Sequence, residues 1–415
     1  NQSVKPVQKY APSWIDWASI AILSSADRWN STEKRMMRSA TRNHLIHSSL
    51  VAAAIVICMT VGWATWRHSD AVATVKQLQT VRTDELNDVL KQIRDHGSFA
   101  DGALGRALAE SNPASRERTL NQLGLLQHDL SQRKSLIEQC PDIELPLLMV
   151  VRDQLAALSG PERETLLAVL RDPEVSPPRR LRAAIMIGGQ LSFDESFQVN
   201  LNEEESETIV REMLRHATIA PQDNSHLIDA LEPIHSTLIP TLLTRTRSRE
   251  DTSVRSLATA FTIQFLRESP EELLEFFLDA SFAQQDTILA VLGDQLTKVA
   301  DRIRGLAYTE IDLNLPEPTY DVLARRRGVA AALLHRLGQA DSTWSLLRRT
   351  EWPHTRGYLI NRIGPLGGEF DVLLTRVSRE VDPSIRRALV LALGGFDWGQ
   401  IPELTRSQAL LLVKD

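Results

Sequence analysis

The chain has 415 residues, of which 43% are hydrophobic and 24% charged, the balance of an ordinary folded protein. Residues 1–47 hold seven Lys or Arg and three Asp or Glu, which leaves 40 basic and 50 acidic side chains for the remainder. This acidic main part lacks the clustered basic face that nucleic-acid binding requires, so we expect no nucleic-acid partner. The two cysteines, Cys58 and Cys140, exclude a disulfide framework and Cys-x-x-Cys sites for metal or redox chemistry.

Residues 1–44 are predicted to be a cytoplasmic juxtamembrane segment that contains two helix starts. Ser13 is expected to cap a helix over residues 14–23, because a serine hydroxyl can accept a hydrogen bond from a free backbone N–H of the first turn. A second helix should begin with Ser31 or Thr32 as its cap. The basic side chains of this second helix favour contact with anionic lipid headgroups.

Residues 45–67 predict a single transmembrane helix. No charged side chain occurs from Ser48 to Trp66, and about 20 residues, at 1.5 Å per residue, cover a bilayer core of roughly 30 Å. A cleaved signal peptide is disfavoured because a long hydrophilic segment precedes the run. The alternative is a buried core helix, which would make the chain a cytoplasmic adaptor without a membrane span.

The residues that flank the span predict its orientation. Lys and Arg outnumber Asp and Glu ahead of the span, and such basic residues stay on the cytoplasmic side. Trp63 and Trp66 then lie where an outer interfacial aromatic belt is expected. We therefore expect a single-pass protein of the cytoplasmic membrane, with the lipid bilayer as one partner, a cytoplasmic N-terminus and a periplasmic or other extracytoplasmic main part. Small residues in the span leave a homodimer open.

Residues 68–160 are predicted to form a helical linker and the N-terminal part of a helical array. The apolar stripe between residues 71 and 95 predicts one helix, which Gly97 ends in a left-handed conformation. Two or three further helices should follow. Breaks that contain proline separate them, at residues 111–113, 140–142 and 159–162.

Residues 161–415 repeat a pattern in which a turn is followed by an arginine and then by small and aliphatic residues. The arginines are spaced by 73, 72, 29 and 30 residues, at Arg182, Arg255, Arg327, Arg356 and Arg386. Recurrence at 30 to 36 residues, with 73 and 72 as two periods, is typical of paired-helix repeats. The sequence therefore predicts an all-α fold, a single transmembrane helix followed by an α-solenoid of HEAT-like repeats over residues 161–415. The alternative is a non-repetitive helical domain.

The run Asp382-Pro383-x-x-Arg386-x-Ala388 resembles one HEAT-type unit. In such a unit Asp caps the second helix, Pro begins it, and Arg reaches an acid or a carbonyl of the adjacent repeat. The triplet at residues 325–327 is expected to serve in the same inter-repeat ladder, with Asp321 or Glu351 as acidic partners. Its alternative role is an anionic ligand site.

Two stretches of the chain resemble a known family. They are Pro12-Ser13-Trp14-Ile15-Asp16-Trp17 with Trp29-Asn30-Ser31-Thr32-Glu33-Lys34-Arg35-Met36-Met37-Arg38-Ser39-Ala40 ahead of the span, and residues 325–396. They resemble large multidomain bacterial membrane proteins that are typical of planctomycetes. In that family a cytoplasmic protein kinase or STAND-type NTPase part precedes one membrane helix and a helical-repeat region. A formylglycine-generating-enzyme-like (sulfatase-modifying-factor) domain often follows. The resemblance implies that this chain is the middle of a longer protein whose enzymatic domains lie outside it.

No catalytic, cofactor or metal site is expected, because P-loop, His-Glu-x-x-His and kinase motifs are absent from the sequence. Trp344 and Trp352 are candidate interaction residues if they lie exposed on the solenoid surface. The most consistent hypothesis is a membrane-anchored, non-catalytic interaction scaffold or sensor of a larger bacterial signalling protein, which binds an unidentified protein. The alternative is the spacer of an enzyme whose catalytic domain lies outside this chain.

Overall fold

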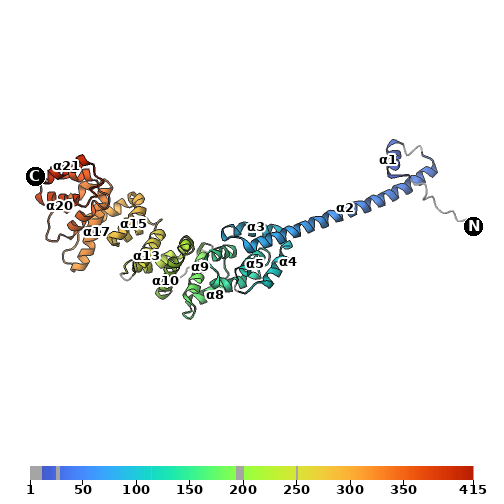
Figure 1. Ribbon diagram of the computed structural model, residues 1–415, viewed down its shortest axis with the longest axis horizontal. Helices are drawn as coiled ribbons and strands as arrows, with labels where there is room; N and C mark the ends of the chain where they lie inside the picture. Colours follow the sequence, from blue (N-terminus) through green and yellow to red (C-terminus); the bar gives the residue numbers. More distant parts are fainter. Residues whose placement is uncertain (1–11, 25–28, 114, 193–200, 249–250, 415) are drawn as a thin grey trace, which may run out of the picture. The chain divides into compact units, whose positions relative to one another are not determined.

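The computed structural model describes residues 12–24, 29–113, 115–192, 201–248 and 251–414 (Figure 1). Every regular element in these ranges is an α-helix or a short 3₁₀-helix, and no strand occurs in them, so the predicted all-α class is confirmed. The chain divides into two compact units, Asn1–Leu136 and Ile137–Asp415. This division falls within the predicted segment 68–160.

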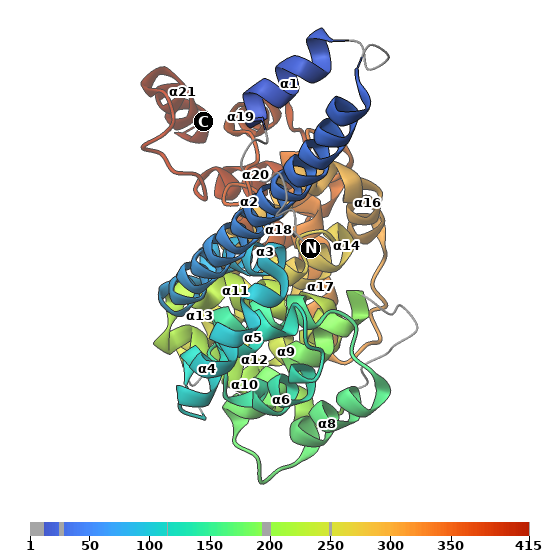
Figure 2. The same ribbon diagram turned by 90° about the vertical axis from the view of Figure 1, so that its right-hand side faces the viewer.

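The first unit begins with α1 (Trp14–Leu23), whose bounds and cap are as predicted. The backbone N–H of Asp16 donates to the Ser13 hydroxyl at 3.2 Å, which satisfies one of the free amide groups of the first turn. α1 lies beside the N-terminal part of α2 (Figures 1 and 2).

α2 (Ser31–Thr80) is a single helix of 50 residues. The prediction that Ser31 or Thr32 caps it is wrong, because Asn30 is the cap. The Asn30 side chain accepts from the Ser31 N–H at 2.6 Å, and the Glu33 carboxylate accepts from the Asn30 N–H at 2.7 Å. The Glu33 N–H also donates to the Asn30 side chain, and this bond and the one from the Asn30 N–H to Glu33 form a complete capping box one residue before the predicted cap.

The predicted helix over residues 71–95 is also wrong, because α2 runs on to Thr80 and a separate helix follows. Val81 has an extended backbone, η3 (Thr83–Glu85) forms one tight turn, and α3 (Leu86–His96) then packs against α2. The apolar pattern of the sequence continues across this break because the end of α2 and α3 pack against each other and bury their apolar side chains there. Gly97 ends α3 with a φ of 59°, as predicted.

An apolar window of 18 residues within α2 is wholly exposed in the structure. α2 contains the predicted span, residues 45–67, and it is the one helix among the described residues that is long and apolar enough to cross a membrane. Past the window, Ala71, Thr74, Val75 and Leu78 are buried again. The rest of the unit consists of α4 (Asp101–Glu110) and α5 (Arg116–Leu126), both of which contact α2. α6 (Gln132–Gln139) crosses the division between the units.

The second unit consists of helices that pack mainly against helices close to them in the chain. Contacting pairs include α8 with α9, α12 with α13, α14 with α15, α16 with α17 and α19 with α20, and α17 also packs against α14 and α18. Within this unit the helices follow one another in chain order (Figure 1). Their bounds are α7 (Leu145–Leu155), α8 (Gly160–Arg171), α9 (Pro177–Gly188), α10 (Glu203–Ile219), α11 (Asn224–Leu231), α12 (His235–Thr246), α13 (Thr252–Phe265), α14 (Pro270–Asp279), α15 (Phe282–Leu292), α16 (Ala300–Tyr308), α17 (Glu317–Arg336), α18 (His354–Arg362), α19 (Phe370–Arg379), α20 (Pro383–Leu393) and α21 (Glu403–Lys414).

Local sequence signals set several of these helix starts. The Ser159–Glu162 capping box opens α8, and Pro383 is the first residue of α20. The Asp382 carboxylate accepts from the backbone N–H of Ser384 at 2.8 Å, as predicted for the HEAT-type unit.

Candidate functional site

Four of the five predicted ladder arginines donate to backbone carbonyls, and they do so from the helices that follow a turn. The side-chain bonds run from Arg182 to Pro141 (3.2 Å), from Arg255 to Ser248 (3.0 Å), from Arg327 to Ala307 (3.0 Å) and from Arg356 to Leu347 (2.8 Å). Arg386 is half-buried and has no side-chain hydrogen bond within the described part of the chain. The carbonyls at a helix end lack intrahelical partners, and a guanidinium supplies both donors and a complementary charge.

Burial lowers the pKa of two of these arginines. It lowers the pKa of the Arg182 guanidinium, although Asp142 and Glu212 oppose the change. Burial also lowers the pKa of Arg327. Both groups start from such a high pKa that they remain charged at neutral pH, so they act as permanent donors.

The arginine triplet pairs with acids other than those predicted. The Arg326 guanidinium binds the carboxylates of Glu275 and Asp279, the latter at 3.1 Å. Arg302 also donates to Glu275, at 3.0 Å. Although burial would raise it, the hydrogen bonds from these two arginines hold the pKa of Glu275 below its ordinary value. Asp321 instead accepts from the Tyr358 hydroxyl at 2.9 Å. The reason is tertiary: α17 packs on α14, which presents its two acids one helical turn apart.

The two candidate tryptophans differ in exposure. Trp344 is buried, with its ring 4.6 Å from that of His335 and its indole N–H donating to Asp341 at 3.2 Å. Trp352 is half-buried and packs against Tyr320, with ring centroids 5.0 Å apart. Trp344 therefore contributes to the core, and Trp352 retains an accessible part.

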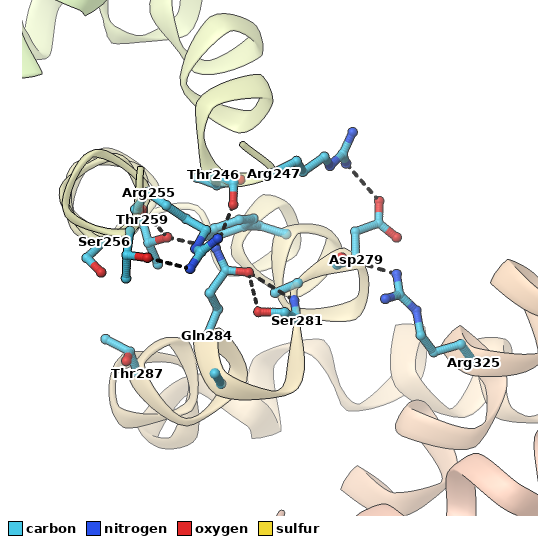
Figure 3. Close-up of a pocket in the computed structure, with 14 residues that line it drawn as sticks. Thr246, Arg247, Arg255, Ser256, Thr259, Asp279, Ser281, Gln284, Thr287 and Arg325 are labelled. Atoms are coloured by element: carbon cyan, nitrogen blue, oxygen red, sulfur yellow. Dashed lines mark hydrogen bonds and ion pairs between the residues drawn. The ribbon is translucent and has the colours of Figure 1, made fainter. Parts of the chain in front are cut away.

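A hollow of the second unit lies where the ends of α12 and α14 meet the starts of α13 and α15 (Figure 3). We call it the α13–α15 groove. Its volume is about 700 Å³, and Arg247, Arg255, Arg325, Asp279 and Gln284 line it together with six hydroxyl side chains. The hydroxyls belong to Thr246, Thr252, Ser256, Thr259, Ser281 and Thr287.

Gln284 holds the wall of the groove in place (Figure 3). Its amide nitrogen donates to the Thr246 carbonyl at 3.0 Å and to the Thr259 hydroxyl at 2.9 Å. Its amide oxygen accepts from the Ser281 hydroxyl at 2.7 Å and from the Ser281 N–H at 3.0 Å. One side chain thus joins the end of α12, α13 and the start of α15, and it fixes the geometry of the hydroxyls around it.

The charges of the groove are unbalanced among the described residues. Arg255 donates to the Ser248 carbonyl and to the Thr252 hydroxyl, both uncharged. Arg325 donates at 3.1 Å to the backbone carbonyl of Asp279, while the Asp279 carboxylate is shared by Arg247 and Arg326. Two guanidinium charges therefore lack a carboxylate partner within the described ranges, in a region of the chain that is acidic as a whole.

Such a groove suits an anionic group, because guanidinium and hydroxyl donors line it and two of the guanidinium charges lack a carboxylate partner among the described residues. The described part of the chain contains no group of three or more His, Cys, Asp or Glu side chains that could hold a metal ion. The sequence pointed to Arg255 and to the triplet that includes Arg325, but not to the groove that both residues line. The hydroxyl side chains at the helix starts, at residues 252–256 and at Ser281, were the sequence feature that could have indicated the groove.

No protein-family model, curated protein or solved structure matches the chain.

Proposed function

We propose that this chain is the membrane-anchored interaction region of a larger bacterial signalling protein. In this proposal α2 crosses the cytoplasmic membrane once, with the N-terminus in the cytoplasm. The helices of the second unit form a HEAT-like α-solenoid that binds a partner protein outside the cytoplasm and performs no catalysis. The observation that carries the proposal is the wholly exposed apolar window of α2, which continues as one helix into a packed helical unit.

The anchor is supported by the side chains along the window. Leu50, Met59 and Trp66 are each more than 60% exposed, and soluble proteins rarely expose a continuous apolar surface of this extent. At the far end the Arg67 guanidinium stands over the Trp63 ring, 5.5 Å from its centroid. An aromatic ring beside a cation is suited to the interface between lipid and water.

The solenoid is supported by the packing of each helix against its neighbours in the chain and by four of the five arginines, which donate to backbone carbonyls. It is also supported by the close approach of α17 and α18 at Gly328, where an added Cβ would lie 2.9 Å from the Thr355 carbonyl oxygen. In a repeat array each unit contacts only its neighbours, so close contacts between successive helices stabilise the whole array.

The partner that suits the α13–α15 groove is a protein segment rich in Asp and Glu. Arg255 and Arg325 provide the unpaired positive charge, and a carboxylate that binds a guanidinium through two hydrogen bonds gains both strength and orientation. The resemblance of residues 12–47 and 325–396 to planctomycete multidomain proteins supports a parent that joins this surface to a cytoplasmic kinase or NTPase part. If the chain were only the spacer of an enzyme, no partner would depend on the groove.

The topology is tested with single cysteines in the full chain. Cys140 is unsuited as a probe, because burial raises the pKa of its thiol to about 12. We would therefore introduce Thr32→Cys or Glu174→Cys, both at exposed positions, in a C58A background. An impermeant maleimide added to spheroplasts should label Glu174→Cys at once and Thr32→Cys only after lysis. The reverse order, or release of the chain by carbonate washing, would refute the proposed anchor.

The groove is tested by fluorescence anisotropy with a labelled hexaglutamate peptide and a hexaglutamine control. The double variant R255Q/R325Q should bind hexaglutamate at least tenfold more weakly, since a hydrogen bond to a charged group contributes about 1.5–3 kcal/mol. The variant R267Q/R349Q removes the same charge from exposed arginines outside the groove and should change the affinity little. Equal losses in both variants would show diffuse attraction and no groove site.

A further inference from the structure

The hollow between α1 and the start of α2 is a second built site, and the proposed function leaves its role open. Its volume is about 670 Å³. Its walls combine the rings of Trp17 and Trp29 with three cationic side chains of α2, Lys34, Arg38 and Arg42. We name it the α1–α2 hollow, and both of its helices belong to the first unit.

α1 is held against α2 by specific contacts. The Trp17 indole N–H donates to the Thr41 hydroxyl at 2.9 Å, and the Trp17 ring lies 5.6 Å from that of His44. The His44 Nε2 atom lies 3.1 Å from the Pro12 carbonyl oxygen. These contacts hold α1 beside the N-terminal part of α2, where the two ribbons lie next to each other (Figures 1 and 2).

The outer surface of α1 is apolar although nothing in the described chain covers it. Ile15, Ile22 and Leu23 are 70%, 82% and 84% exposed, and Trp14 is 58% exposed. The helix has ten residues, which is too short to cross a bilayer. A short apolar helix beside a membrane span fits in the interfacial layer, where its side chains enter the acyl region.

The cations and the apolar residues of the hollow are ordered along α2. Lys34, Arg38 and Arg42 recur every four residues on one face and extend over about 12 Å, and Leu45 and Ile46 follow on the side of the span. None of the three cations forms an ion pair with a described residue. The lining residues include no acid. A positive end followed by an apolar end matches the two ends of an anionic phospholipid, its phosphate and its acyl chains.

We propose that the α1–α2 hollow binds the headgroup of an anionic phospholipid, such as phosphatidylglycerol, with the phosphate between Arg38 and Arg42 and the acyl chains beside Leu45 and Ile46. The Trp17 and Trp29 rings form the wall against the glycerol region. The proposal rests on the membrane anchor proposed for α2, because only then does the hollow lie at the depth of the headgroups.

The test uses the full chain in micelles of a neutral detergent, titrated with phosphatidylglycerol or phosphatidylcholine and read by native mass spectrometry. The wild type should retain phosphatidylglycerol in preference. The variant R38Q/R42Q should lose about 25-fold in affinity, if each basic side chain contributes about fivefold. The matched variant R35Q/K76Q removes two exposed cations of α2 that do not line the hollow, and it should lose less than threefold. R38K/R42K, which keeps the charge, should retain most of the preference.

Two outcomes would overturn the lipid site. One is an equal loss of affinity in R35Q/K76Q, which would show a diffuse electrostatic attraction to anionic lipid. The other is tight binding of inorganic phosphate alone by the wild type, which would show a site for a free anion. Carbonate washing of membranes from the same strains separates this proposal from the anchor. If the wild type stays in the membrane but shows no lipid preference, only the lipid site fails. If it is released, the anchor itself fails.

Discussion

His335 is a buried titratable side chain in the second unit. Its Nε2 lies 2.8 Å from the Thr343 hydroxyl oxygen, and its ring is nearly perpendicular to that of Trp344, with the centroids 4.6 Å apart. Burial lowers the pKa of this imidazole from 6.5 to about 4, because a charged ring would lose its hydration without gaining a counter-charge. The neutral ring is therefore part of the core, and the unfolded chain binds a proton that the folded chain excludes.

This difference predicts a pH dependence of stability. Because the folded pKa lies below the unfolded one, the stability is complete above pH 6.5 and is lost as the pH falls toward 4. Between pH 7 and pH 5 the loss should be about 2 kcal/mol, from roughly 1.4 kcal/mol per pH unit. Urea unfolding at both pH values would measure it. The variant H335Q should lack this part of the dependence, and an unchanged slope in H335Q would contradict the assignment.

At the scale of the helices, the contact of α17 with α18 depends on the absence of a side chain at Gly328. A Cβ there would lie 2.7 Å from the Tyr358 Cβ and 3.1 Å from the Leu359 nitrogen, so the α18 backbone itself stands in the way. No rotation of a side chain can relieve a contact with backbone atoms, and the two helices would have to move apart.

The variant G328A should therefore lower the free energy of unfolding by about 1–3 kcal/mol, the usual cost of overpacking. G357A, in the facing helix α18, is the matched control because an added Cβ there meets nothing within 4 Å. It should be neutral or slightly stabilising, since alanine favours helix more than glycine does. Thermal or chemical unfolding of both variants measures the difference, and equal effects would refute the close approach.

The same scale shows what could be predicted from the sequence and what could not. Ser13, Gly97 and Asp382 lie at the helix ends that they stabilise, so these ends could be predicted from neighbouring residues in the sequence. The partners of Arg325 and Arg326 lie 46 to 51 residues earlier in the chain, on α14, and no local pattern identifies them. The α13–α15 groove was missed for this reason, because its lining comes from four consecutive helices and from α17.

At the scale of the whole molecule, the continuity of α2 is itself open to test. Spin labels at Ser49→Cys and Lys76→Cys, both exposed, are 27 residues apart and should be about 40 Å apart along an unbroken helix. Pulsed electron paramagnetic resonance of the full C58A chain in nanodiscs should give a narrow distance distribution. Adding S69P should shorten and broaden it, because proline breaks the helix, whereas S69A should not. A broad distribution without S69P would contradict a continuous α2.

An unbroken α2 also sets a mechanical rule for the first unit. α1 docks near Thr41, and α3 and α5 also pack against α2, so a twist or axial shift at one end of the continuous helix passes to the other end. Each inserted residue would turn one end against the other by about 100° and lengthen the rod by 1.5 Å. An insertion of seven residues nearly restores the phase, whereas two residues place the faces on opposite sides. The rotation of one end of α2 relative to the other is therefore set by the number of residues between them, just as its length is.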